Sequence, residues 1–236
     1  MTIGNFTAAT GQAGRGQNIR SRAHDAEKQI LAPDRGSIAV FGPRHAGMET
    51  ILMRVVGGKL RSRALAGPKT AAVRPTSDRL REALFNILTH SYGEPVNGAR
   101  VLDLFAGTGA LGIEAISRGA AYALFVDEGV EARALLRDNV ESLGLGGVTR
   151  IFRRDAAKLG PAHPVEAFSL VFIDPPYGKG LAEKALESAR HGGWLKPEAL
   201  LVVEEAVDAK FKAPEGFQEL ERRTYGDTEF VFIRQA

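Results

Sequence analysis

Hydrophobic runs and helix-like patterns alternate along the chain from Ala99 onward. Runs typical of strands stand at 99–105, 122–127, 148–155, 169–174 and 199–205, and helical patterns stand at 110–118, 130–144 and about 181–191. Strands that alternate with helices form a parallel sheet covered on both faces. The segment 217–235 predicts a hairpin that turns at Gly226-Asp227, which adds an antiparallel edge. The pattern therefore predicts an α/β fold for residues 94–236.

The residues before this domain divide into two parts. Residues 1–52 are rich in Gly, Ala, Arg and Gln without a sustained period, which predicts a disordered leader. Residues 53–93 predict a small extension, in which two β-like runs around Gly57-Gly58 form a hairpin and a helix follows, capped by Thr76 or Ser77. The apolar face of that helix consists of Leu80, Leu84, Ile87 and Leu88, and the side chains expected off this face are Arg79 and Arg81.

Charge is spread unevenly although the net charge is only +3. Residues 53–90 carry eight Lys or Arg against two Asp or Glu, and residues 91–236 carry 17 against 22. A basic segment beside an acidic domain indicates either a polyanionic partner or a solvated surface. The chain has no Cys, which excludes disulfides and thiolate chemistry. No apolar run approaches the ~20 residues of a membrane helix, so we expect a cytoplasmic protein that does not enter a membrane.

A glycine-rich motif follows the first strand of the domain. Residues 107–112 read G-x-G-x-x-G, and Asp127 lies 20 positions after Gly107, which formally matches the dinucleotide fingerprint. A dinucleotide would bring a pyrophosphate to the helix N-terminus. Asp103 stands four residues before the first glycine, and its carboxylate would repel a phosphate and attract a cation.

Acids stand at the ends of four predicted strands: Asp103, Asp127, Asp155 and Asp174. The carboxyl ends of parallel strands meet at one edge of a sheet, where open α/β sheets bind ligands. S-adenosylmethionine fits such an edge, because it carries an ammonium and a sulfonium and no phosphate. We expect Asp103 near its amino-acid end, Asp127 on the ribose hydroxyls and Asp155 on the adenine amine. Two alternatives stay open, since Glu128 is a second candidate for the ribose and Asp155 can simply cap a helical turn.

The fourth of these strands ends in Asp174-Pro175-Pro176-Tyr177. An exocyclic base amine is a poor nucleophile, because its lone pair is delocalised into the ring. Asp174 and the Pro175 carbonyl can each accept one amine N–H, and the two prolines fix these acceptors in advance. Tyr177 can stack on an extruded base. Lys179 follows in a glycine-flanked loop, where it contacts a phosphate of the target strand or is simply solvated.

Three stretches together resemble the RsmD family, bacterial enzymes that methylate the exocyclic N2 of one guanine in 16S rRNA: "RPTSDRLREALFNIL", "DLFAGTGALGIEA" and "VFIDPPY". The resemblance covers residues 53–236. It implies a Rossmann-like class I methyltransferase fold, with a mostly parallel seven-stranded sheet that ends in an antiparallel hairpin. It also implies S-adenosylmethionine as cofactor and 16S rRNA within an assembling small subunit as substrate. S-adenosylmethionine is already activated, so no metal is required. The oligomeric state stays open, with a monomer as the default expectation.

The resemblance assigns roles to matching positions. Cofactor contacts are expected from Asp103, Phe105, Gly107, Gly109, Asp127, Asp155, Ala156 and Thr76. Catalytic positions are expected to be Asp174, Pro175, Pro176 and Tyr177. The matching N-terminal block also implies RNA contacts from Arg74 and Arg79. The basic charge of residues 53–90 adds Arg61 and Arg63 as expected RNA contacts, and the loop after the motif adds Lys179.

Three other functions remain open from the sequence. The first is methylation of another exocyclic amine, such as adenine N6 in DNA or RNA, because the four-residue motif is shared with such enzymes. The second is an NAD(P)-linked oxidoreductase built on the glycine motif. The third is an RNA-binding module without catalysis, against which the intact motif argues.

Overall fold

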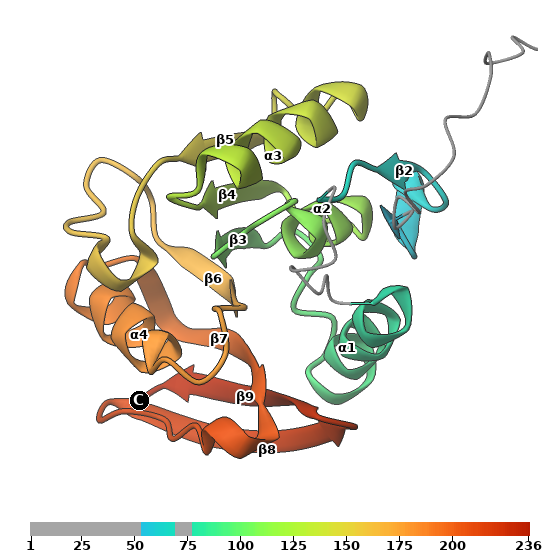
Figure 1. The fold of residues 1–236 in the computed structure, drawn as a ribbon. Coiled ribbons are helices and arrows are strands. Elements are labelled where there is room, and N and C mark those ends of the chain that lie inside the picture. The colour runs from blue at the N-terminus through green and yellow to red at the C-terminus, as the bar shows by residue number, and fades with distance from the viewer. Residues whose placement is uncertain (1–52, 69–76) are drawn as a thin grey trace, which may run out of the picture. The chain divides into compact units, whose positions relative to one another are not determined.

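A computed structural model describes residues 53–68 and 77–236 (Figure 1). The predicted leader 1–52 lies outside these residues, and so do two of the predicted site residues, Arg74 and Thr76. None of the described helices is long and apolar enough to span a membrane.

A seven-stranded sheet forms the centre of the described fold. Its strands are β3 (Arg100–Leu104), β4 (Tyr122–Val126), β5 (Thr149–Phe152), β6 (Phe168–Ile173), β7 (Leu195–Ala206), β8 (Phe217–Tyr225) and β9 (Thr228–Gln235). They lie in the order β5-β4-β3-β6-β7-β9-β8. The first five are parallel, and β9 runs antiparallel to both β7 and β8. This arrangement confirms the predicted fold class, including the hairpin that turns at Gly226-Asp227.

The strand order reverses between β3 and β6. The chain proceeds from β3 outward to β4 and β5, then returns to the other side of β3 as β6. Leu104 and Ile173, the last residues of these two strands, lie opposite each other. The loop that follows β3 and the loop that follows β6 therefore begin side by side at the topological switch point, where open α/β sheets bind ligands.

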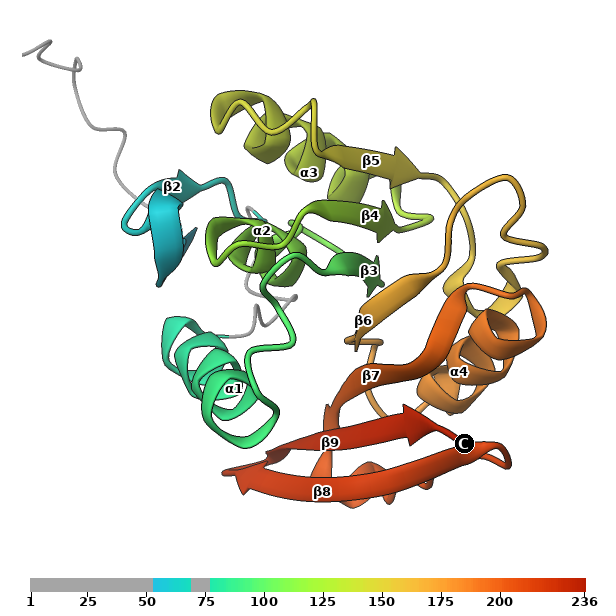
Figure 2. The ribbon, with the colours of Figure 1, turned by 180° about the vertical axis from the view of Figure 1, so that it is seen from behind.

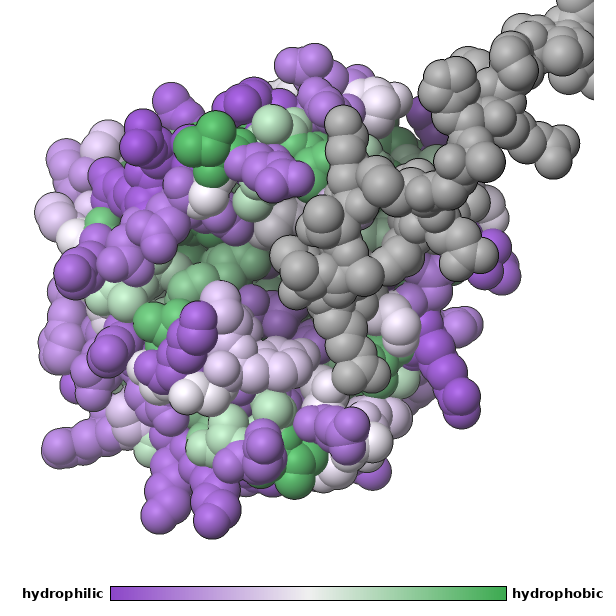
Figure 3. All heavy atoms as spheres, viewed as in Figure 1, coloured by the Kyte–Doolittle hydropathy of each residue, from purple (hydrophilic) through white to green (hydrophobic). Residues whose placement is uncertain are grey.

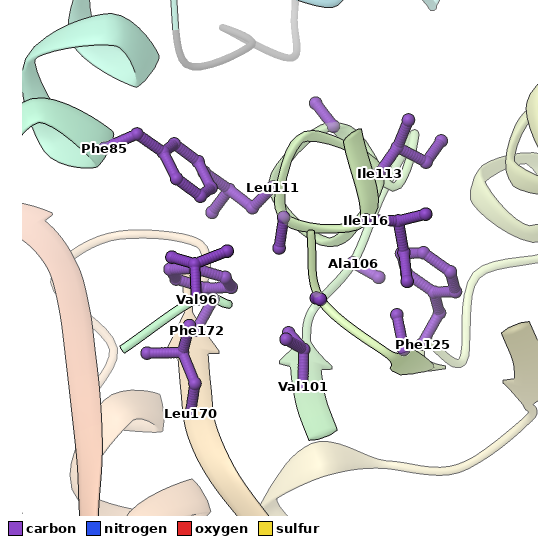
Figure 4. Packing of buried hydrophobic residues seen from close by; sticks show 14 of the residues in the cluster. Phe85, Val96, Val101, Ala106, Leu111, Ile113, Ile116, Phe125, Leu170 and Phe172 are labelled. Atoms are coloured by element: carbon purple, nitrogen blue, oxygen red, sulfur yellow. The ribbon is translucent and has the colours of Figure 1, made fainter. Parts of the chain in front are cut away.

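Helices cover both faces of the sheet (Figures 1 and 2). On one face lie α1 (Asp78–Ser91), α2 (Ala110–Ser117) and α3 (Val130–Ser142), and on the other α4 (Leu181–His191) and the short helix η2 (Ala156–Lys158). Figure 4 shows the hydrophobic core between the sheet and helices α1, α2 and α3. In this core Phe85 of α1 packs near Phe172 of β6, with ring centroids 5.6 Å apart. A further 3₁₀ turn, η3 (Val207–Ala209), follows β7.

The predicted N-terminal hairpin is present and is bonded to α2. β1 (Met53–Arg54) pairs with β2 (Ala64–Leu65), but a longer connection than the predicted turn joins them and includes the 3₁₀ helix η1 (Gly58–Leu60). The carboxylate of Glu114 accepts the N–H of Val56 at 2.8 Å, and Ser117 Oγ accepts that of Leu60 at 2.9 Å. These bonds fix the hairpin on the helix that follows the glycine loop.

The prediction that Arg81 lies off the apolar face of α1 is wrong. Ser77 caps the helix, and its hydroxyl accepts the N–H of Leu80 at 3.2 Å. Arg81 is fully buried; its guanidinium donates to the carbonyl of Arg54 at 2.7 Å and to Asp78 Oδ1 at 2.6 Å. An arginine can lie inside because the hairpin backbone and an acid one turn earlier accept hydrogen bonds from its guanidinium.

Candidate active site

The glycine loop is organised around a buried acid of β3. Asp103 is 1% exposed, and its Oδ2 accepts the N–H of Gly112 at 2.9 Å. Burial raises the pKa of Asp103 to about 8; the bond from Gly112 opposes this shift, and the nearby charge of Asp127 adds to it. A cation placed beside this carboxyl would favour its ionised form.

The loop itself requires left-handed backbone at three positions in quick succession. These are Phe105 (φ +60°), Gly107 (φ +56°) and Gly109 (φ +79°). Phe105 is not glycine, so its conformation stores about 1–3 kcal/mol of strain, which is common at ligand sites. A Cβ on Gly109 would lie 2.3 Å from Leu136 Cδ1, so glycine is needed there for close packing as well as for its φ. The sharp turn places the loop's N–H groups at the start of α2.

Asp127 joins the glycine loop to the next strand. Its Oδ2 accepts the N–H of Gly107 at 2.9 Å and its Oδ1 that of Gly129 at 2.7 Å. Each carboxylate oxygen has room for a second donor, so both can still receive ribose hydroxyls. Glu128 is more exposed and also lines the cavity described below. The choice between Asp127 and Glu128 as a ribose ligand stays a prediction.

Asp155 has a structural role that the sequence left open. Its strand, predicted over 148–155, ends at Phe152, so Asp155 lies beyond the strand rather than at its end. Asp155 is the N-cap of η2, and its Oδ1 accepts the N–H of Ala157 at 2.9 Å. The cap engages only one of its two oxygens, and both Asp155 and buried Ala156 line the cavity.

The four-residue motif starts directly after β6. The N–H of Asp174 points to the carbonyl of Leu104 at 3.4 Å, which places the motif beside the glycine loop. The Tyr177 hydroxyl donates to Glu204 Oε1 at 2.8 Å, and the next N–H, of Gly178, donates to Glu205 Oε1 at 2.9 Å. Burial raises the pKa of Tyr177, and the charges of Glu204 and Asp174 raise it further. Tyr177 is nevertheless 36% exposed, so one part of the residue is accessible to a ligand.

A cavity of about 670 Å³ collects these groups. Among the described residues that line it are Asp103, Phe105, Gly107, Asp127, Ala156 and the whole motif from Asp174 to Tyr177. The lining contains five acids and, within the described part of the chain, a single basic side chain, that of Arg154. In the space-filling view a hollow with an apolar floor opens near the middle of the face, and hydrophilic residues border part of it (Figure 3). Such a cavity suits a cationic ligand with an apolar body better than a dinucleotide.

Several residues of the site were not predicted from the sequence. Met53 and Pro68 belong to the N-terminal extension yet line the same cavity, so the extension completes the site. Arg154 also lines the cavity; its guanidinium donates to the carbonyl of Leu159 at 2.5 Å and lies 5.4 Å from the centre of the Phe152 ring. Glu204 and Glu205 hold the motif from β7, and their one sequence signal is a pair of acids at the end of an apolar run.

The residues expected to face RNA lie at the surface where they are described. Arg61 and Arg79 are exposed and line, with Arg54, a second cavity of about 280 Å³ between the hairpin and α1. Arg63 is exposed and donates to the carbonyl of Ser142 at 3.1 Å. Lys179 is exposed in the loop after the motif.

Comparison with known proteins places the chain in a family. Residues 53–234 match the family described as "Conserved hypothetical protein 95". The chain is similar to Ribosomal RNA small subunit methyltransferase D of Escherichia coli, with 38% identity over 70% of this chain and 80% of the relative. It is similar to the protein of the same name from Haemophilus influenzae, with 34% identity over 74% and 89%. The chain belongs to the RsmD family.

Solved structures agree with this assignment. The Escherichia coli protein yhhF superimposes with a TM-score of 0.65 and 32% identity over 78% of this chain and 98% of its own. The Thermus thermophilus protein TTHA0928 gives a TM-score of 0.61 and 34% identity over 77% and 98%. This RsmD-family chain is a methyltransferase with the class I fold, and its methyl donor is S-adenosylmethionine.

Proposed function

We propose that this RsmD-family enzyme transfers a methyl group from S-adenosylmethionine to the exocyclic N2 of a guanine in 16S rRNA. The observation that carries the proposal is the position of the Asp174–Tyr177 motif, which follows β6 and lies beside the acid-lined loop that follows β3. The small-subunit rRNA methyltransferases among the relatives support the class of substrate. The guanine N2 assignment rests on the resemblance of the motif and of the arginine-containing stretch before the glycine loop.

The chain offers a suitable ligand set for the cofactor. Asp103 faces the amino-acid end, Asp127 accepts the ribose hydroxyls, and Asp155 with Ala156 borders the adenine. Thr76, which lies outside the described residues, is expected to close over the same cavity. S-adenosylmethionine supplies an electrophilic methyl group on a sulfonium, so the protein needs to provide mainly position and charge.

The motif acts on the target amine. Asp174 and the Pro175 carbonyl accept the two N–H bonds, which favours a pyramidal nitrogen with an available lone pair. Pro176 restricts the backbone between these acceptors and Tyr177. The partly exposed ring of Tyr177 stacks on the extruded base. The proton released after transfer passes to Asp174 or to water.

The N-terminal extension, residues 53–93, forms the RNA-facing part of the enzyme, and residues 94–236 form the methyltransferase domain. Arg61, Arg63, Arg74 and Arg79 hold phosphates of the substrate, and Lys179 contacts the strand beside the motif. The enzyme acts as a monomer in the cytoplasm on a small subunit in the course of assembly.

Methyl-labelled S-adenosylmethionine tests the proposal. The enzyme is incubated with naked 16S rRNA, with partly assembled small subunits and with DNA, and the modified nucleoside is identified by mass spectrometry. We expect N2-methylguanosine at one position and at least a roughly 100-fold loss of rate in Asp174→Ala, which removes one of the two acceptors. N6-methyladenosine would assign the enzyme to the alternative class of exocyclic-amine methylation. No transfer to any of these substrates would refute the proposal.

A further inference from the structure

Two adjacent glutamates of β7 form hydrogen bonds to the catalytic motif and to the residue that follows it. Ile173 lies opposite Val203 in the sheet, so the residues that follow, Asp174 and Glu204, stand at the same level. Both glutamates are almost inaccessible, with Glu204 3% and Glu205 2% exposed. Glu204 accepts the hydroxyl of Tyr177, and Glu205 accepts the N–H of the following glycine and also that of Ala206 at 3.0 Å. Successive strand residues point to opposite faces of the sheet, so Glu204 and Glu205 bond to the motif loop from different faces.

We propose that Glu204 is a positioning residue for methyl transfer, which orients the Tyr177 ring as the platform for the target base, while Glu205 fixes the turn that follows. This inference rests on the proposed function, because the platform matters only when a planar base is the substrate. Neither glutamate touches the reacting atoms; both act through the motif.

Burial argues for a positioning role. A carboxylate inside a protein loses hydration, and an apolar side chain of similar size at this strand end would avoid that loss. The sequence instead places two acids where the apolar run of β7 ends. Each acid is compensated by a donor from the motif loop, at 2.8 and 2.9 Å.

The geometry explains what the pair achieves for the ring. Tyr177 is 36% exposed, and an exposed tyrosine rotates about its side-chain torsions. Here the backbone end is restrained by Pro176 and by the bond from Gly178 to Glu205, while the hydroxyl end is restrained by Glu204. The Thr228 hydroxyl also contacts the Tyr177 hydroxyl from β9. With both ends held, the ring keeps one orientation before the base arrives, which removes an ordering cost from the reaction.

Three variants test the role of Glu204. Glu204→Leu removes the acceptor, and Glu204→Gln keeps a carbonyl oxygen that can accept from the hydroxyl. Glu229→Gln is the matched control, because Glu229 is equally buried at 3%, lies opposite Glu205 on β9 and pairs with Arg222 instead of the motif. We expect kcat to fall about tenfold or more in Glu204→Leu, and to stay within about threefold of wild type in the other two. The KM for S-adenosylmethionine should not change in any of them.

A double-mutant cycle separates positioning from general damage. Tyr177→Phe keeps the ring and removes the hydroxyl through which Glu204 acts. The kcat of the variant Tyr177→Phe/Glu204→Leu should therefore be no lower than that of Tyr177→Phe alone, because the effects of substitutions at two contacting residues do not simply add. If the fold losses of kcat in the two single variants multiply in the double variant, the inference is overturned.

A spectroscopic readout keeps the test independent of activity. The chain has four tyrosines, so ring-labelled tyrosine gives few NMR signals, and Tyr177→Phe assigns the one that matters. The Tyr177 signals should shift or broaden in Glu204→Leu and stay in place in Glu204→Gln and Glu229→Gln. Failure of the proposed function would show as absence of methyl transfer by wild type, with the Tyr177 signals still displaced in Glu204→Leu. Unchanged signals in Glu204→Leu of an active enzyme would refute the positioning role alone.

Discussion

Two hydrogen bonds join the side chain of Asn139 to the backbone of Ala66. Asn139 Oδ1 accepts the N–H of Ala66 at 2.7 Å, and Asn139 Nδ2 donates to the carbonyl of Ala66 at 3.1 Å. The same Nδ2 donates to the carbonyl of Thr108, inside the glycine loop, at 2.9 Å. Asn139 lies on α3 and is 1% exposed. One buried amide thus connects the cofactor loop to the end of the N-terminal hairpin.

Replacement of Asn139 should weaken both structures that it joins. Asn139→Ala removes three hydrogen bonds and leaves backbone groups of Ala66 and Thr108 without this partner, so we expect the free energy of unfolding to fall by about 1–3 kcal/mol. The affinity for S-adenosylmethionine should fall as well, because Thr108 loses its support. Chemical denaturation and calorimetric titration measure the two effects. The control is Asn86→Ala on the exposed surface of α1, which should change stability by less than about 0.5 kcal/mol.

Gly58 should decide whether the hairpin can dock on α2. A Cβ at Gly58, where φ is +72°, would lie 2.0 Å from the backbone oxygen of Ser117. Gly144 has nearly the same φ, +69°, and nothing within 4 Å of the added Cβ. Gly58→Ala should therefore lower rRNA affinity and loosen the hairpin, whereas Gly144→Ala shows the backbone strain alone. Hydrogen exchange at Val56 and Leu60 reports the docking, and equal protection in both variants would contradict the prediction.

Asp103 should release a proton when the cofactor binds. Its pKa is about 8 in the free enzyme, so the carboxyl is mostly protonated at neutral pH, and a bound cation favours the ionised form. Calorimetry at neutral pH in buffers of different ionisation enthalpy should show release approaching one proton. Asp103→Asn should bind more weakly and release none. Affinity in wild type should rise between about pH 5.5 and about pH 7, a range that lies below the α-amino pKa of the cofactor.

The same group makes the free enzyme's stability depend on pH. The pKa of Asp103 is raised from 3.8 to about 8 on folding, so the folded state holds a proton that the unfolded chain has lost between these values. The stability contributed by the neutral carboxyl is complete below about pH 4 and is lost as the pH rises through about 8. Asp103→Asn should therefore melt at a higher temperature than wild type above about pH 8, and the difference should shrink towards about pH 4. A constant difference across this range would show that Asp103 is ionised throughout.

The arginines of the extension should set the salt dependence of rRNA binding. Arg61→Ala/Arg63→Ala/Arg74→Ala should weaken binding and reduce the slope of log K against log salt by about 0.7–0.9 for each phosphate that is no longer neutralised. A control with the same change in charge is Lys158→Ala/Lys184→Ala/Lys196→Ala, three lysines outside the extension. Cofactor affinity should be the same in both triple variants. An unchanged slope in the arginine variant would remove these residues from the RNA surface.

Sequence patterns predicted those features that depend on neighbouring residues. The alternation from Ala99 onward indicated the order of elements, and the motif at Asp174 was found because its spacing is local. Burial of Arg81 was not predictable, since it depends on a carbonyl of the hairpin, at Arg54, that only the fold brings near. The cap formed by Asp155 remained ambiguous because a carboxylate before a helical turn suits a cap and a ligand equally well.

The residues that hold the site in place through hydrogen bonds were the hardest to predict. In the sequence Glu204 is only a polar residue at the end of an apolar strand. The register of β6 and β7 places it beside the motif. Asn139 sits within a helical pattern that gives no sign of its bonds to Ala66 and Thr108. Such bonds join residues far apart in sequence, so they follow from the topology and not from any local periodicity.

The position of β9 has a consequence for how the enzyme is made. β9 is the last described strand along the chain, yet it lies between β7 and β8 and bonds to both. During synthesis β7 therefore leaves the ribosome with an open edge, and that edge closes only after residues 228–235 have emerged. Thr228 of that same strand touches Tyr177, so the surroundings of the Tyr177 ring are completed only after β9 has emerged, and a nascent chain stalled before β9 would carry the motif without its full support.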